Sequence, residues 1–173
     1  LETYFGYTSF RPAQEAPIAS LLRNEDVIGI MPTGAGKSIC FQIPALCKAG
    51  LTIVFSPLIS LMKDQVDGLL VQNIPAALIN STLTQSEFNK TMYEVRSGKI
   101  KLLSSNFFCN VLRALPIAQV IVDEAHCISE WGHDFRPSYR LIGEWLNSLP
   151  KRPIVGAFTA TATKYVENDI KKL

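Results

Sequence analysis

The chain has 173 residues, of which 47% are hydrophobic and 18% charged. This length can bury one sizeable hydrophobic core but is short for two, so we expect a single domain. Its 17 basic and 15 acidic side chains give a formal charge of +2, which neither indicates nor excludes a polyanionic partner. No apolar stretch approaches the roughly 18 residues of a membrane span. The start also lacks a charged segment followed by an apolar one, so we expect a soluble, intracellular protein with no membrane contact.

Short apolar segments rich in β-branched residues alternate with segments of helical period. The expected strands are residues 27–31, 51–55, 76–79, 100–103, 119–122 and 154–158. This alternation predicts an α/β fold, a mostly parallel sheet with helices on both faces. Ligands of such sheets bind beyond the carboxyl ends of the strands. The segments 31–38, 56–60, 123–126 and 159–163 should therefore converge on one edge.

The sequence MPTGAGKS at residues 31–38 follows an expected strand and opens an expected helix, the context of a P-loop. Glycines let backbone N–H groups turn toward phosphate oxygens, and the start of a helix adds partial positive charge. We expect Lys37 to reach the outer phosphates and Ser38 to ligate Mg²⁺. The usual pattern has glycine where this chain has Met31, yet a plain strand-to-helix turn would leave the order Gly-Lys-Ser unexplained. The predicted nucleotide-binding residues of this loop are Thr33, Gly34, Ala35, Gly36, Lys37 and Ser38.

An apolar strand ends in two adjacent carboxylates, Asp123 and Glu124. Asp123 is the predicted ligand of magnesium and Glu124 the predicted catalytic base. Taken alone, such a pair could instead cap a helix, but together with the P-loop it favours hydrolysis. For His126 two interpretations are evenly balanced: a catalytic relay beside the nucleotide, or a hydrogen bond to a neighbouring loop.

The cysteines form no C-x-x-C pair and lie in or beside apolar runs, which predicts free thiols rather than disulfides. They are Cys40, Cys47, Cys109 and Cys127. His126, Cys127 and His133 lack the paired spacing of a structural zinc site, so a metal centre there is not favoured.

Four segments carry a resemblance to the RecQ DNA helicases of helicase superfamily 2, and the similarity extends over essentially the whole chain. They are MPTGAGKS, SPLISLMKDQV at 56–66, DEAHCISEWGHDFRPSY at 123–139 and TATAT at 159–163. The resemblance implies a RecA-like P-loop NTPase lobe over residues 1–173, using ATP and Mg²⁺. It also implies single-stranded and partly duplex DNA as partners, with roles in DNA repair and recombination. The protein would act at the nucleoid if bacterial and in the nucleus if eukaryotic.

By the same resemblance, the segment at residues 5–14 would recognise adenine, with Gln14 reading the edge of the base and Arg11 nearby. Trp131, Phe135 and Arg136 would belong to an aromatic-rich loop that couples DNA binding to hydrolysis. If these rings serve DNA rather than the core, at least one of them should be exposed in the DNA-free state.

Two further segments resemble DNA-associated motifs of the family. The first would hold the phosphates of a single strand without reading sequence. The second would link the ATP site to DNA, and Thr161 or Thr163 could also cap the last helix. The predicted residues of these segments are Ser56, Pro57, Lys63, Gln65, Thr159 and Thr161.

The chain departs from the family pattern after Leu103, where a Pro-Glu-Arg contact motif would be expected before Ser104. Either the protein lacks this segment or the sequence as given omits it, and we favour the second because the flanks resume the pattern. The second motor lobe, the zinc-binding region and the winged-helix domain of the family are absent too. We therefore expect a fragment of a longer protein, almost inactive as an isolated hydrolase.

Two other functions remain open from the residues. A small-molecule kinase would also have a P-loop and a parallel sheet, but it would have no use for DEAH followed by an aromatic loop. A binding module that had lost turnover would fit the fold, although Lys37, Asp123 and Glu124 are all present.

Overall fold

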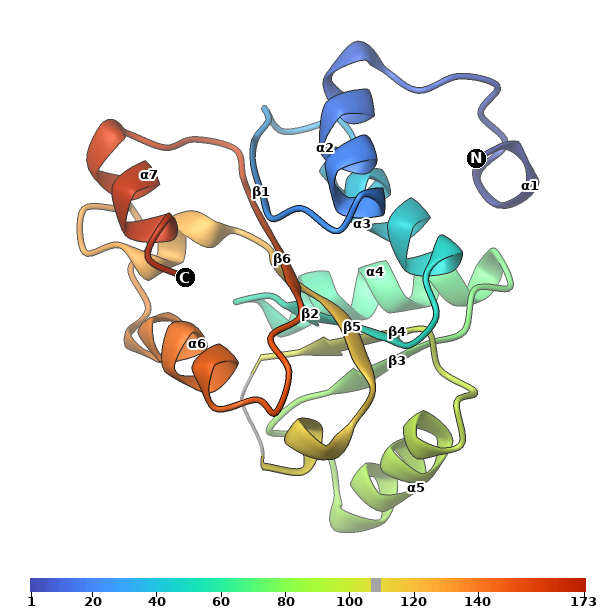
Figure 1. The fold of residues 1–173 in the computed structure, drawn as a ribbon. Helices are drawn as coiled ribbons and strands as arrows, with labels where there is room; N and C mark the ends of the chain where they lie inside the picture. Colours follow the sequence, from blue (N-terminus) through green and yellow to red (C-terminus); the bar gives the residue numbers. More distant parts are fainter. Residues whose placement is uncertain (107–109) are drawn as a thin grey trace.

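The computed structural model describes residues 1–106 and 110–173. Within these residues, six strands form one sheet in the order β1-β6-β5-β2-β4-β3, and every neighbouring pair is parallel (Figure 1). The strands are β1 (Val27–Ile30), β2 (Leu51–Phe55), β3 (Ala76–Ile79), β4 (Leu102–Ser105), β5 (Ile117–Val122) and β6 (Ile154–Thr159). The predicted α/β fold with a parallel sheet is confirmed.

Four strands differ from their predicted bounds, β1 and β6 by one residue at the end and β4 and β5 by two residues, because ladder hydrogen bonding, not hydrophobicity, fixes their ends. β4 extends to Ser104 and Ser105, which are buried beside β2 and β3 although both carry hydroxyls. β5 begins at Ile117, two residues before the predicted start, and pairs with Leu51 across a register irregularity. β4 runs unbroken through Leu103 and Ser104, where the family's extra segment was expected.

Helices cover both faces of the sheet, so that each strand is buried on two sides. The face covered by α2, α3 and α4 holds one apolar cluster, and the face covered by α5, α6 and α7 holds the other (Figure 1). The helices are α1 (Glu2–Phe5), α2 (Pro12–Leu22), α3 (Lys37–Cys47), α4 (Ile59–Val71), α5 (Gln85–Arg96), α6 (Pro137–Asn147) and α7 (Lys164–Ile170). Two short 3₁₀ helices, η1 (Asn110–Ala114) and η2 (Ala125–Ile128), flank β5.

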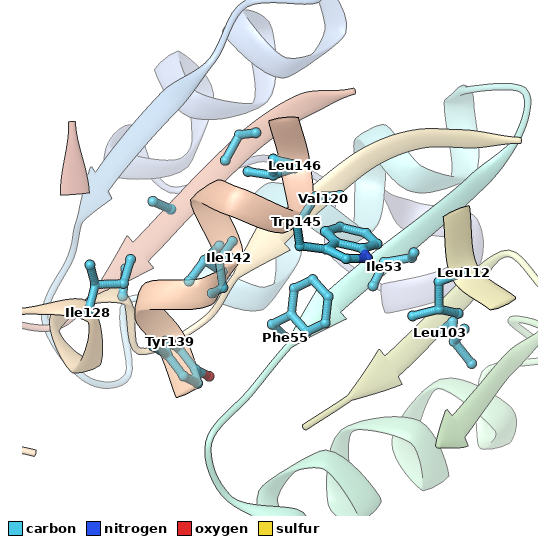
Figure 2. Packing of buried hydrophobic residues seen from close by; sticks show 14 of the residues in the cluster. Ile53, Phe55, Leu103, Leu112, Val120, Ile128, Tyr139, Ile142, Trp145 and Leu146 are labelled. Carbon is cyan, nitrogen blue, oxygen red and sulfur yellow. The ribbon is translucent and has the colours of Figure 1, made fainter. Parts of the chain in front are cut away.

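Successive residues of the central strands point to opposite faces and fill both clusters. From β2, Phe55 meets Trp145 of α6 edge to face at 5.4 Å between ring centroids (Figure 2). Its neighbour Val54 belongs to the opposite cluster, where Phe41 and Phe158 pack at 5.7 Å. The sheet is thus held from both sides, which fixes the loops at its carboxyl edge.

The described cysteines are free thiols, as predicted: Cys40 and Cys127 are buried and Cys47 is exposed. Burial raises the pKa of Cys40 to about 11 and that of Cys127 to about 12, so neither is a reactive thiolate. Cys109 lies outside the described residues. In the part of the chain that the structure describes, no helix is both long and apolar enough to span a bilayer.

Candidate nucleotide site and its neighbouring loops

A cavity of about 580 Å³ lies at the carboxyl edge of the sheet, within the range of small-ligand sites. The loops after β1 and β5 and the helix α4 contribute to it, as expected for a parallel sheet. Its lining residues are Tyr7, Ser9, Arg11, Gln14, Thr33, Gly34, Gly36, Lys37, Ser38, Ile39, Leu61, Gln65, Asp123 and Glu124. The P-loop residues, the adenine-side pair and both carboxylates predicted from the sequence are brought together here, except that Ala35 does not line the cavity.

The phosphate loop, residues 31–38, has the backbone shape that its glycines permit. Gly34 and Gly36 adopt φ values of 80° and 82°, which side-chain-bearing residues rarely occupy. α3 begins at Lys37, directly after Gly36, so its first N–H groups face the cavity end of the loop. The Lys37 Nζ donates to the Met31 carbonyl oxygen at 3.2 Å, which holds the ammonium across the loop.

Gln14 and Arg11 brace the phosphate loop from α2. Gln14 Oε1 accepts from the Arg11 backbone N–H at 2.9 Å, and its Nε2 donates to the Gly36 carbonyl at 3.1 Å. The Arg11 guanidinium donates to the Gly34 carbonyl at 2.5 Å. A Cβ on Gly36 would overlap the Gln14 amide, so a larger residue here would displace that side chain in addition to straining φ. Both predicted adenine-side residues therefore contact the loop itself in this structure.

The two carboxylates differ in their surroundings. Asp123 is 4% exposed and accepts from Gln65 Nε2 at 3.2 Å and from the Glu124 backbone N–H at 3.0 Å. Burial raises the pKa of Asp123 above its ordinary value, against the lowering effects of the Gln65 hydrogen bond and the Lys37 charge. Glu124 is only half-buried and has a left-handed backbone at φ 48°. The strained backbone aims a second carboxylate into the cavity from the adjacent position.

His126 is buried behind the carboxylates and does not line the cavity. Its Nδ1 lies 2.8 Å from Thr159 Oγ1 and 3.3 Å from Glu124 Oε2. Thr159 Oγ1 donates to the Thr161 carbonyl at 3.1 Å, so its oxygen is left to accept from a protonated Nδ1. The imidazole thus makes the predicted hydrogen bond to a neighbouring loop, and its role as a catalytic relay stays a prediction.

The imidazole of His126 also stacks on His133, with ring centroids 4.1 Å apart and planes at 16°. Burial, followed by the charge of His133, lowers the pKa of His126 below its ordinary value. The neutral imidazole is therefore the favoured form.

The aromatic loop, residues 131–136, presents its two rings differently. Trp131 is 74% exposed, which meets the expectation that at least one ring faces solvent without DNA. Phe135 is half-buried under the Arg140 guanidinium, 5.1 Å from its ring centroid. Arg136 donates to the Pro57 carbonyl at 3.1 Å and pairs with Asp134 at 3.2 Å. This contact ties the aromatic loop to the segment after β2.

The predicted DNA-contact residues do not form one exposed surface. Ser56, Pro57 and Thr159 are buried, and the Ser56 backbone N–H already donates to the Ser105 carbonyl at 3.2 Å. Lys63 and Thr161 are exposed, whereas Gln65 faces the cavity and contacts Asp123. For the buried members, any influence on a bound strand has to pass through their neighbours.

Four lining residues were not singled out from the sequence: Tyr7, Ser9, Ile39 and Leu61. Leu61 and Gln65 lie four residues apart on α4, and this helical spacing could have placed both on one face. Tyr7 and Ser9 lie in the irregular segment before α2, whose path has no periodic signal. Thr163, the other capping candidate, does cap α7 by accepting from the Val166 N–H at 3.4 Å, while Thr161 contributes only its carbonyl to Thr159.

Comparisons with known proteins place the whole chain among helicases. The family model for DEAD/DEAH box helicases matches residues 11–169. The chain is 48% identical to the ATP-dependent DNA helicase RecQ of Bacillus subtilis over 99% of its own length and 30% of that protein. It is 46% identical to RecQ of Haemophilus influenzae over 98% of its length and 28% of that protein. The chain thus spans less than a third of these relatives.

The alignment with the Bacillus protein runs over 180 positions, more than the 173 residues of the chain, so that relative has residues with no counterpart here. Among solved structures, a hypothetical ATP-dependent RNA helicase from Sulfolobus tokodaii superimposes with a TM-score of 0.68 at 19% identity, covering 96% of this chain and 50% of its own. The helicase domain of Hef from Pyrococcus furiosus gives 0.66 at 18% identity, covering 94% and 36%. These two likenesses show the fold alone.

Proposed function

Because the chain belongs to the DEAD/DEAH box helicase family, we propose that it is the ATP-binding motor lobe of a RecQ-type DNA helicase. The observation that supports this most directly is the single cavity in which the phosphate loop meets the carboxylates of Asp123 and Glu124. The kinase alternative is not favoured, since the relatives at 46–48% identity are named as RecQ helicases.

The residues of the cavity fit a nucleoside triphosphate with magnesium. The glycine backbone and the start of α3 would hold phosphate oxygens, and Lys37 would exchange the Met31 carbonyl for the outer phosphates. Ser38 and Asp123 would hold Mg²⁺, which supplies charge neutralisation when bound. Glu124, adjacent to Asp123 and less buried, would take a proton from the attacking water.

Adenine recognition would use the side chain that braces the phosphate loop. The Gln14 amide accepts the Arg11 N–H at Oε1 and donates from Nε2 to the Gly36 carbonyl. An adenine that pairs with this amide would use the second lone pair of Oε1 and the second N–H of Nε2, so the base and the phosphate loop would share one side chain. Base recognition and the shape of the phosphate loop would in that case be coupled.

Two contacts would connect this site to DNA. Gln65 joins α4 to Asp123, and Arg136 joins the aromatic loop to Pro57, which precedes α4. Lys63 and Trp131 lie exposed at the outer ends of this path, where a single strand could contact charge and ring. Nucleotide binding and DNA binding would each change the conformation of the same loops. The protein would act in the nucleoid of a bacterium or in a eukaryotic nucleus.

Full turnover would need a second RecA-like lobe, which is proposed to supply an arginine to the transition state. Such an arginine contributes roughly three to five powers of ten in rate in related NTPases. Closure of the two lobes on ATP and reopening after hydrolysis would move the enzyme along single-stranded DNA and separate partly duplex DNA.

The test is ATP hydrolysis by the intact protein with and without single-stranded DNA, compared with the same assay on residues 1–173. We expect strong stimulation by DNA in the intact protein, near silence in the lobe, and no turnover in the Lys37→Ala variant, which controls for contaminating ATPases. DNA-independent turnover by the lobe alone would contradict the proposal and indicate a self-sufficient NTPase. Absence of turnover in the intact protein with DNA would indicate a binding module instead.

A further inference from the structure

Two large aromatic side chains from different segments lie together at the surface. Trp131 of the aromatic loop and Tyr165 of α7 have ring centroids 5.9 Å apart and planes inclined at 36°. Trp131 is 74% exposed and Tyr165 is 70% exposed, so the pair leaves most of both rings in water. Paired rings that remain this exposed contribute little to the core, which favours a role in binding.

The pair is held in place by hydrogen bonds through Ser129 and Asp169 beneath it. The Trp131 N–H donates to Ser129 Oγ at 3.2 Å, and the Ser129 hydroxyl donates to Asp169 of α7 at 2.7 Å. The loop after β5 and α7 lie side by side (Figure 1), and Val166 of α7 is buried next to Tyr165. The two rings therefore lie where the loop after β5 packs against α7, and not on a free loop.

The charges around the pair do not oppose an anionic partner. Acidic side chains near it would repel a polyanion, but each one that is close in sequence has a basic partner within 4.0 Å. These pairs are Glu130–Arg140, Asp134–Arg136, Glu167–Lys171, Glu167–Lys164 and Asp169–Lys172. The rings are thus exposed in a locally neutralised surface, where stacking rather than net attraction would decide binding.

We propose that Tyr165 and Trp131 together form a two-ring platform on which an unpaired base of single-stranded DNA stacks. Tyr165 is then a DNA-binding residue of α7, outside the segments assigned to DNA contact from the sequence. This inference rests on the proposed function. The rings carry no hydrogen-bonding pattern that selects one base over another, so the platform accepts any base whose face is uncovered. A fully paired duplex covers those faces and is a poor ligand.

The platform would also connect bound DNA to the nucleotide cavity through α7. The helix follows the 159–163 segment, in which Thr159 contacts His126 at 2.8 Å beside Glu124. A base seated on both rings would hold α7 and the loop after β5 as one unit. Loss of Tyr165 would remove the second ring, while the Ser129–Asp169 hydrogen bond would still tie the loop of Trp131 to α7.

The experiment measures binding of the intact protein to a labelled oligothymidylate of about 15 nucleotides by fluorescence anisotropy. An abasic chain with the same number of phosphates serves as the second probe. The variants are Tyr165→Ala, Tyr165→Phe, Trp131→Ala and, as a matched exposed tyrosine on α5, Tyr93→Ala. Thermal unfolding of each variant checks that the fold is retained.

For oligothymidylate we expect Tyr165→Ala to weaken binding about fivefold or more, the effect of losing one stacking ring. Its affinity for the abasic chain should stay unchanged. Tyr165→Phe should bind like the wild type because the ring is kept, and Tyr93→Ala should have no effect.

If Trp131→Ala weakens oligothymidylate binding and Tyr165→Ala does not, the platform is overturned while the proposed DNA site stands. If neither variant changes binding, the DNA role of the aromatic loop fails with it. Equal losses by Tyr165→Ala on both probes would also overturn stacking as the mechanism.

Discussion

The phosphate loop and the aromatic loop start from the same edge of the sheet but are built in opposite ways. In the phosphate loop, Lys37, Gln14 and Arg11 all donate to carbonyls of the loop itself, so its shape is set before any ligand binds. In the aromatic loop, Trp131 points into solvent and the polar contacts of the chain lie beneath it. One loop is held in shape by its own hydrogen bonds, and the other is proposed to offer its exposed ring to a polymer.

The largest predicted effect is on ATP turnover and concerns the cavity beside the phosphate loop. Replacing Glu124 by Gln removes the proposed base while keeping the shape of the side chain, and turnover should fall by about 100-fold to 10,000-fold. Nucleotide affinity should change little, because Asp123 and Lys37 are intact. DNA-stimulated hydrolysis and binding of a fluorescent ATP analogue measure the two quantities separately. A variant that keeps wild-type turnover would remove Glu124 from the mechanism.

In the aromatic loop, a substitution should change the stimulation by DNA and not the basal turnover. Trp131→Ala should bring DNA-stimulated turnover down to the DNA-free rate while leaving that basal rate intact. Because the side chain is 74% exposed, the free energy of unfolding should stay within about 0.5 kcal/mol of the wild type. Steady-state ATPase against DNA concentration and urea unfolding measure these two effects. Full stimulation in the variant would contradict the coupling role of the loop.

The same contrast explains how far the sequence predicts this site. The phosphate loop was predictable because glycine accepts the left-handed backbone at Gly34 and Gly36 most readily, and Lys37 and Ser38 follow at fixed spacing. The sequence could not predict that Trp131 is exposed and that Arg140 covers Phe135. Both rings are hydrophobic, and either could equally have filled a core.

Tertiary packing decided the positions that sequence patterns left undefined. Gln65 was assigned to DNA contact from its segment, whereas α4 turns it toward Asp123 at 3.2 Å. Ser104 and Ser105 extend β4 because strands on both sides supply backbone partners. A pattern of apolar residues does not predict such an extension. The pairing of Trp131 with Tyr165 joins residues 34 positions apart and depends on how α7 docks. Local patterns therefore located the loops, and packing assigned their side chains.

A smaller effect should distinguish the two glycines of the phosphate loop. Both have positive φ, so alanine costs roughly 1–2 kcal/mol of backbone strain at either position. Gly34 has no neighbouring atoms within 4 Å of a built Cβ, whereas at Gly36 the Cβ meets the Gln14 amide and displaces its hydrogen bond. Gly36→Ala should therefore lower the free energy of unfolding by about 1 kcal/mol more than Gly34→Ala. Urea unfolding of the two variants measures the difference, and equal losses would show that Gln14 does not brace the loop.

The smallest effect concerns pH and the imidazole that lies between the two loops. Burial and the charge of His133 lower the pKa of His126 below 6.5, with opposing influence from Asp134 and Asp123 and a further lowering by Lys37. The unfolded chain then binds a proton at this position more readily than the folded chain does, so stability decreases as pH falls below about 6.5. Above that pH both states carry a neutral imidazole and the effect vanishes.

His126→Asn should flatten this part of the stability profile, because the amide can still donate to Thr159 Oγ1 but cannot titrate. His133→Asn should weaken the slope without abolishing it, since burial of His126 is the larger cause. Urea unfolding between pH 5 and 8, the range where imidazoles change charge, measures the three profiles. An unchanged slope in His126→Asn would assign the acid sensitivity to other groups. In that case the imidazole would serve only as the hydrogen-bonded link from Glu124 to the loop after β6.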